Sequence, residues 1–368
     1  MKNRLVIASL VLTMSSFSWP AMAAPRGDLA HATADLSSAT QAKVSAAVDG
    51  FMRAVMKPER SANDLGWDCL AAAALADLGI KEAGSRLADI ADEMLRDAVR
   101  STRTGRPIGW SSASSDRSCV SGESIAGSKP ACEGPTTVYA FQSGLGIACM
   151  ARAGELMQRS DLLAAGREVM LYWSKLRLER VPCKECIYFA TSDSVADANR
   201  YIRNMNIFVA FGAAQLGKAT HDDTLIKIAL DSVRSDIWER DNGNRGYLGK
   251  LDPQWTSHAG EAERIENHSA SVALLLAEIA RLSDVLEVKQ QALSVWRDWA
   301  TCDNKRCQTT GCKYWAGDPS RCQSSATSAH CAFRSRDSFA KFQCEKFLEL
   351  VPSLNAYGIL AVLQPSLR

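Results

Sequence analysis

The chain has 368 residues, and its 43 lysines and arginines nearly balance its 41 aspartates and glutamates, so the formal net charge is +2. A charge this close to zero excludes a strong whole-molecule attraction for polyanions, and we expect no nucleic-acid partner. The length would allow two domains, but no linker rich in proline, glycine or serine separates compositionally different halves. We therefore expect one domain, over residues 24–368.

Residues 1–23 have the pattern of a secretory signal. A basic beginning with Lys2 and Arg4 is followed by a short apolar run and by Ala21-Met22-Ala23, which resembles a cleavage site. Neither this run nor any later stretch is long enough to span a bilayer comfortably. The pattern predicts an exported protein, periplasmic or secreted, without membrane insertion.

All twelve cysteines follow this signal, and in an oxidising compartment they most simply form disulfides. Six of them crowd residues 302–344, where few apolar residues could otherwise order the backbone, so we expect disulfides to staple this Cys-rich segment. Cys183 and Cys186 form a CxxC motif, which could bind zinc or exchange thiols. No second Cys or His pair stands at ligand spacing, and we expect neither a metal nor another cofactor.

Helical patterns of two kinds alternate along the chain. Short helices rich in alanine, glycine and serine are each followed by a longer amphipathic helix with a charged face. The predicted helices cover residues 40–56, 67–78, 81–100, 136–157, 161–176, 198–217, 222–239, 264–282, 285–299 and 338–363.

Small-residue helices can pack closely around an axis, whereas helices with one apolar face suit an outer shell. The alternation therefore predicts an all-α fold, an (α/α) toroid of about five to six helical hairpins. An open helical solenoid is the alternative.

In a toroid the inner helices begin at one rim, and their polar starts would line one cleft. These starts carry Trp67, Asp68, Tyr139, Gln142, Asn199, Arg203, Asn267 and His268. Trp110, in the long loop 104–135, would lie in one wall.

Two of the inner-helix starts repeat one spacing. Polar residues three or four positions apart share one face of the first turn, so neighbouring helices would present them together. In one helix these residues are Arg264, Asn267 and His268. In the other they are Arg203 and Asn206, and Arg200 and Asn204 each lie one residue away from that face. The alternative is that these groups only cap the helices and contact solvent.

Four stretches follow in order: YIRNMNIFVAF, WERDNGN, RGYLGKL and RIENHSASVALLL. This order resembles the alginate-lyase-type toroids among the polysaccharide lyases, over residues 201–280. In that family an inner helix opens with Asn-Asn-His, an outer helix and a Gly-(Phe/Tyr)-Leu turn follow, and the next inner helix carries the catalytic Tyr. The resemblance puts Asn204 where the family keeps its carboxylate-neutralising Asn, Met205 where it keeps its His, and His268 near its Tyr. It implies cleavage of an acidic polysaccharide by β-elimination.

Elimination from a uronate needs a group that stabilises charge on the carboxylate, a base, and an acid for the leaving oxygen. Asn204 or Arg203 could serve as the first. His268 is the best base because its ordinary pKa lies near neutrality, with His258 as the fallback. Tyr247 or Tyr139 could donate the proton. Further carboxylates would bind to Arg200, Arg245, Lys250 and Arg264, and sugars would stack on Trp67, Trp110 and Trp255.

Two other functions stay open. A glycoside hydrolase would use two carboxylates, for which Asp68 and Glu266 are the candidates. A non-catalytic binding or inhibitor protein on the same scaffold would explain Met205 and the Cys-rich segment, since a stapled surface loop often serves recognition. The expected partner is thus an acidic polysaccharide or oligosaccharide, and the non-catalytic protein could bind either a glycan or another protein.

Overall fold

The computed structural model describes residues 62–77, 79–111, 124–125, 129–130, 133–178, 181–194, 197, 201–244 and 269–300, and the single positions 38, 41, 42, 45 and 49. The predicted signal sequence, the Cys-rich segment 302–344 and the predicted helix 338–363 lie outside these residues. Within the described part, no helix is long and apolar enough to cross a bilayer.

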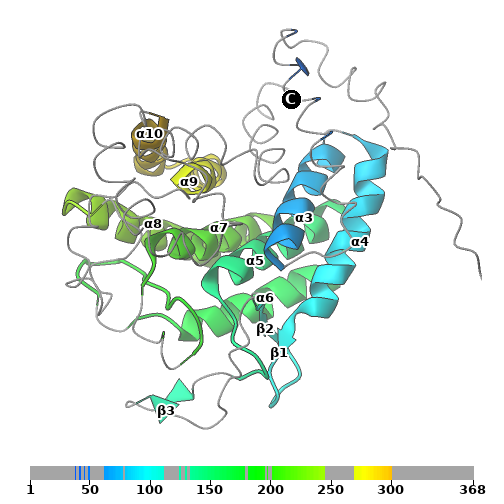
Figure 1. Cartoon of the computed structure of the whole chain (residues 1–368), viewed down its shortest axis with the longest axis horizontal. Coiled ribbons are helices and arrows are strands. Elements are labelled where there is room, and N and C mark those ends of the chain that lie inside the picture. Colours follow the sequence, from blue (N-terminus) through cyan, green and yellow to red (C-terminus); the bar gives the residue numbers. More distant parts are fainter. Residues whose placement is uncertain are drawn as a thin grey trace, which may run out of the picture.

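The described residues are mostly helical, as predicted (Figure 1). The helices are α3 (Ala62–Asp77), α4 (Lys81–Asp97), α5 (Ala140–Leu156), α6 (Ser160–Lys175), α7 (Arg203–Thr220), α8 (Asp223–Asp241), α9 (Ser269–Ser283) and α10 (Leu286–Ala300). Two short antiparallel strand pairs lie between α4 and α5: β1 (Val99–Arg100) with β2 (Pro107–Gly109), and β3 (Ser124–Ile125) with β4 (Lys129–Pro130).

The helices form four consecutive hairpins, in which α3 packs on α4, α5 on α6, α7 on α8 and α9 on α10. The first helix of each hairpin also contacts the first helix of the next one, in the order α3, α5, α7, α9. In Figure 1 the α3–α4 and α9–α10 hairpins lie at the two ends of this row. The alternation of inner and outer helices is therefore confirmed in the described part, whereas closure into a toroid of five or six hairpins stays a prediction.

Glycine brings the backbones of α5 and α7 into contact. A Cβ atom on Gly144 would lie 2.3 Å from the carbonyl oxygen of Phe208, and one on Gly212 would lie 2.7 Å from the carbonyl oxygen of Gly144. Gly144 thus lies opposite Phe208, and Ile147 lies opposite Gly212. From the first of these contacts to the second, the residue number rises in both helices. The two helices therefore run parallel and begin at the same end of the inner layer.

A buried disulfide joins α3 to α5. Cys69 and Cys149 are 0% exposed, their Cα atoms are 5.6 Å apart, and the bond links positions 80 residues apart in the sequence. Three residues before Cys69, a Cβ atom on Gly66 would lie 2.7 Å from Leu145, so these two helices also run parallel. In the chain-entropy model, closing a loop of this length stabilises the fold by about 4 kcal/mol.

Three inner helices begin at residues other than those predicted. α3 begins at Ala62, before the predicted residue 67. Gly66 therefore lies inside this helix, where it packs closely against Leu145. α5 begins at Ala140 rather than at residue 136, because the preceding residues are extended and Tyr139 pairs with Ser192. α7 begins at Arg203 rather than at residue 198, and the residue before it, Ile202, has extended backbone angles.

Replacing Gly144 with alanine tests the contact between α5 and α7. The added methyl group meets backbone that has no side chain to move aside, so we expect Gly144→Ala to lower the free energy of unfolding by about 3 kcal/mol or more. Gly84→Ala in α4 is the matched control, because nothing lies within 4 Å of its Cβ position. It should stabilise the protein by about 0.5–1 kcal/mol in urea denaturation. Equal effects would contradict the close packing.

Candidate functional site

The candidate site lies where α5 and α7 begin. Since Gly144 lies opposite Phe208, one helical turn toward the start of each helix brings Ala140 opposite Asn204. The rings of Phe141 and Phe208, with centroids 4.1 Å apart, pack between the helices just below this level. Tyr139, Gln142 and Asn204 therefore share one end of the inner layer, which we call the rim.

Backbone hydrogen bonds hold Tyr139 and Asn204, whereas Gln142 has an unsatisfied acceptor. The Tyr139 N–H donates to the carbonyl oxygen of Trp110 at 3.1 Å. Asn204 is 7% exposed, and its Oδ1 accepts from the Met205 N–H at 2.7 Å. Gln142 is half-buried, and its Oε1 is a buried acceptor without a hydrogen-bond partner in the part of the chain that the structure describes. A phenol and two carboxamides can bind hydroxyl groups and carboxylates by hydrogen bonds.

Arg203, predicted to bind substrate carboxylates, is instead part of a buried network. Its Nη2 lies 2.5 Å from Asp236 Oδ1, and its Nη1 donates to the carbonyl oxygen of Asn244 at 2.8 Å. Gln291 also donates to Asp236, and Asn244 donates to Glu239. Burial disfavours the charged guanidinium, but Asp236, Tyr201 and Glu239 together more than offset this and raise the pKa of Arg203. In this conformation the guanidinium fastens α7 to α8.

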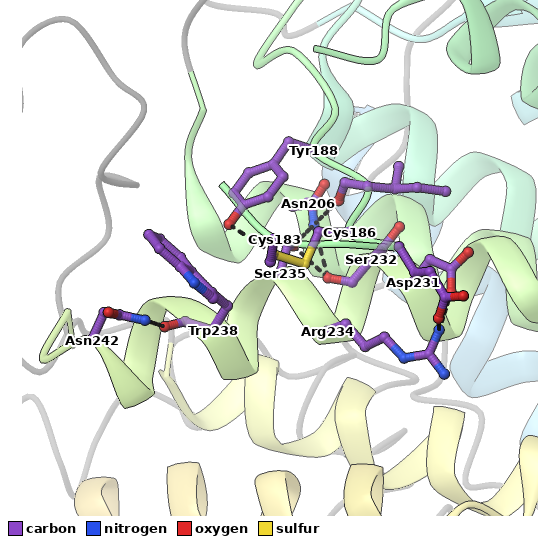
Figure 2. Close-up of a disulfide and its surroundings, with 12 residues drawn as sticks. Cys183, Cys186, Tyr188, Asn206, Asp231, Ser232, Arg234, Ser235, Trp238 and Asn242 are labelled. Atoms are coloured by element: carbon purple, nitrogen blue, oxygen red, sulfur yellow. Dashed lines mark hydrogen bonds and ion pairs between the residues drawn. A yellow bond between two sulfur atoms is a disulfide. The ribbon is translucent and has the colours of Figure 1, made fainter. Parts of the chain in front are cut away.

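Asn206 has a similar structural position (Figure 2). Its Oδ1 accepts from the Phe189 N–H at 3.0 Å, while its Nδ2 donates to Ser235 Oγ at 2.9 Å and to the Ser232 carbonyl oxygen at 3.2 Å. The side chain is 1% exposed. Asn206 therefore fastens the segment before α7 to α8, and its hydrogen bonds face the interior rather than the rim.

Two of the predicted sugar-stacking residues, Trp67 and Trp110, and one predicted carboxylate are core residues. Trp67 is 2% exposed, and its ring contacts Phe208 edge-on at 5.9 Å. Trp110 is 0% exposed, and its indole N–H donates to the Met94 carbonyl oxygen at 2.8 Å. Neither ring has a free face for a sugar. Asp68 is 1% exposed and follows Trp67 inside α3, below the helix start.

The remaining predicted site residues lie outside the described residues. They are Asn199, Arg200, Arg245, Tyr247, Lys250, Trp255, His258, Arg264, Glu266, Asn267 and His268. The last of them directly precedes Ser269, the first described residue of α9, and α9 packs against α7.

A buried acid beside the rim was not anticipated. Asp193 is 3% exposed and joins the segment before α7 to the start of α5, because its Oδ1 accepts from the Val138 N–H at 2.9 Å. Its Oδ2 accepts from the Tyr172 hydroxyl at 2.9 Å. Burial is the main cause that raises the pKa of Asp193 to about 6. The sequence around it, Thr-Ser-Asp-Ser, carries no periodic pattern that would indicate burial.

Arginine substitutions separate a structural role of Arg203 from a binding role. Arg203→Ala leaves the buried Asp236 without its cation, and we expect the free energy of unfolding to fall by about 3–5 kcal/mol. The control is Arg159→Ala, because the partners of Arg159, Asp92 and Asp161, are exposed. That change should cost about 1 kcal/mol or less. A stable Arg203→Ala protein that had lost only affinity for an acidic ligand would instead support the binding role.

Asp193 should make stability depend on pH. Its folded pKa of about 6 lies above the ordinary value, so its contribution is fully present below about pH 4 and is lost as the pH rises through the folded pKa. Relative to the wild type, Asp193→Asn should gain about 2–3 kcal/mol between pH 4 and pH 7, because asparagine never ionises. Denaturation curves at several pH values measure this gain.

The control for this pH dependence is Asp161→Asn. Its hydrogen bond with Arg159 lowers the pKa of Asp161, so its pH dependence has the opposite sign. A constant difference in stability between wild type and Asp193→Asn from pH 4 to pH 7 would contradict the raised pKa.

No protein-family model and no curated protein matches the sequence of this chain. Among solved structures, the chain is similar to a cellobiose 2-epimerase from Bacillus thermoamylovorans B4167, with a TM-score of 0.45 and 10% identity over 66% of this chain and 61% of that chain. A sugar epimerase from a ruminal bacterium gives a TM-score of 0.42 and 11% identity over 64% of this chain and 57% of that chain. The chain thus covers less than two thirds of either structure. The likeness is partial, and it assigns no activity to this chain.

Proposed function

We propose that this chain is an exported carbohydrate-active protein that binds an acidic polysaccharide or oligosaccharide at the rim and cleaves it by β-elimination. The observation that carries the proposal is the parallel register of α5 and α7, which brings Tyr139 and Gln142 to the same end as Asn204. Asn204 is also the residue that the resemblance to the lyases singles out. Export is supported by the Cys69–Cys149 disulfide, since such bonds persist in oxidising compartments.

In this mechanism the carboxamide of Asn204 hydrogen-bonds the uronate carboxylate and stabilises the charge that develops when the adjacent carbon loses its proton. His268 removes that proton, and Tyr139 or Tyr247 protonates the leaving oxygen. Because Asp236 holds Arg203, carboxylate neutralisation falls to Asn204. Neighbouring sugar units would bind to Arg200, Arg245, Arg264, Glu266 and Asn267, and the Gln142 oxygen would accept from a sugar hydroxyl.

A non-catalytic binding protein is the second candidate, and Met205 favours it. The resembled family has a histidine at this position of the first turn, and a thioether cannot take a proton at neutral pH. A hydrolase using Asp68 and Glu266 has less support, because Asp68 is buried inside α3.

A panel of polyuronates and neutral glycans separates these functions. Elimination produces an unsaturated sugar that absorbs in the ultraviolet, whereas hydrolysis produces reducing ends without this absorbance. We expect Asn204→Ala to lower kcat/KM on the best polyuronate by about 100-fold to 1,000-fold, the effect of removing one donor to a developing negative charge. Asn242→Ala, at the exposed end of α8, is the matched control and should change kcat/KM by less than about twofold.

Two further variants distinguish the remaining outcomes. His268→Ala should abolish elimination, and Arg264→Ala should weaken binding and make it less sensitive to salt. Binding without turnover on any glycan would establish the non-catalytic function. Activity that survives His268→Ala but is lost in Asp68→Ala and Glu266→Ala would establish the hydrolase. No binding to any glycan would contradict the lyase, the hydrolase and a glycan-binding protein alike.

A further inference from the structure

A second disulfide joins Cys183 to Cys186, in the connection between α6 and α7. It links positions three residues apart in the sequence, whereas Cys69–Cys149 links positions 80 apart. A bond that closes so short a loop removes little freedom from the unfolded chain, so it contributes little to folding stability. Its presence therefore calls for a reason other than stability.

The two disulfides differ in their access to solvent. Cys69 and Cys149 are 0% exposed, so a thiol cannot reach either sulfur without unfolding. Cys183 is half-buried and Cys186 is 8% exposed. Thiol–disulfide exchange requires a thiolate to approach one sulfur in line with the bond. Of these four residues, Cys183 is the most accessible target.

The residues between the two cysteines favour opening of the bond. Glu185 adopts a φ of 59°, a left-handed conformation that costs free energy for a residue with a Cβ atom. The closed ring holds Glu185 there, and reduction would release it. Lys184, between the two cysteines, is exposed, and a cation beside the bond stabilises the thiolate that leaves when the disulfide opens. Arg234 is paired with Glu185 at 3.1 Å and also with Asp231, so it offsets the negative charge of the carboxylate next to Cys186.

The bond also lies against the residues that support the rim. Figure 2 shows the disulfide beside α8, near Tyr188, Trp238 and Ser235. The Tyr188 hydroxyl is 3.9 Å from Cys183 Sγ, and the Tyr188 ring packs on Tyr201 with centroids 4.4 Å apart. Tyr201 in turn hydrogen-bonds Ser235 at 3.2 Å and precedes α7 by two residues. Opening the bond would loosen the packing that supports the start of α7.

We propose that Cys183–Cys186 is a thiol–disulfide exchange site for a dithiol partner. A thiolate of the partner attacks Cys183 Sγ, a mixed disulfide forms, and Cys186 leaves as a thiolate that takes up a proton. The second thiol of the partner then attacks its own sulfur in the mixed disulfide and releases the Cys183 thiolate, which is protonated. The partner loses two electrons and becomes a disulfide, and this chain gains them as two thiols.

Peptide mass spectrometry on the full oxidised protein, titrated with dithiothreitol and alkylated, tests the proposal. Trypsin cuts after Lys184, so the oxidised pair holds two peptides together and the reduced pair does not. We expect Cys183–Cys186 to be reduced at a dithiothreitol concentration at least about tenfold below that needed for Cys69–Cys149, with the helical circular dichroism unchanged. Reduction only together with loss of helix would overturn the proposal.

Single variants identify the sulfur that is attacked. With oxidised glutathione, Cys186→Ser should form a mixed disulfide at Cys183 at least about tenfold faster than Cys183→Ser forms one at Cys186. Equal rates, or a faster reaction at Cys186, would overturn the assignment.

A double variant tests whether the Cys183–Cys186 bond is purely structural. If the site serves exchange, replacing both Cys183 and Cys186 with serine should lower the melting temperature by no more than about 4 °C. A much larger loss, or failure to fold, would show that the bond is structural and contradict the proposal.

Discussion

The contact between the backbones of α5 and α7 sets the geometry of the rim. Gly144 and Gly212 allow the two backbones to touch at these positions, and this contact fixes both the separation and the register of the helices. The register then decides which residues meet at the rim. A shift of one helical turn between α5 and α7 would separate Asn204 from Tyr139 and Gln142, so the proposed site depends on two small residues that lie below it.

Buried polar groups hold the start of α7 against its outer neighbour. Arg203 and Asn206 each satisfy their hydrogen bonds inside the protein, the first with Asp236 and the second with Ser235 and Phe189. Buried groups of this kind are costly when unpaired and therefore allow only arrangements in which every partner is present. This requirement fixes the orientation of the first turn of α7, in which Asn204 lies between the two anchors.

The helices were predictable because their signal is local. Runs of small residues followed by amphipathic helices are visible within one window of sequence, and each of the eight described helices corresponds to a predicted one. The helix starts were less accurate because they depend on distant partners. Residues before α5 are extended because they pair with the segment around Ser192, far along the chain.

The roles of individual polar residues were harder to predict, for the same reason. Arg203 has the sequence context of a binding residue, but Asp236, 33 residues away, gives it a structural partner. Trp67 precedes a polar residue near a helix start, yet its ring packs on Phe208 of α7. Asn204 lies opposite Ala140 because of the offset between α5 and α7, and its role in binding stays a prediction.

A crystal structure of the protein with a bound acidic oligosaccharide would decide whether the rim is the binding site. We expect the ligand to lie at the starts of α5 and α7, with one carboxylate on the Asn204 amide and a sugar hydroxyl or glycosidic oxygen near Tyr139 or Gln142. A ligand bound at the opposite end of the inner helices, or on the outer face of α4, α6 or α8, would contradict it.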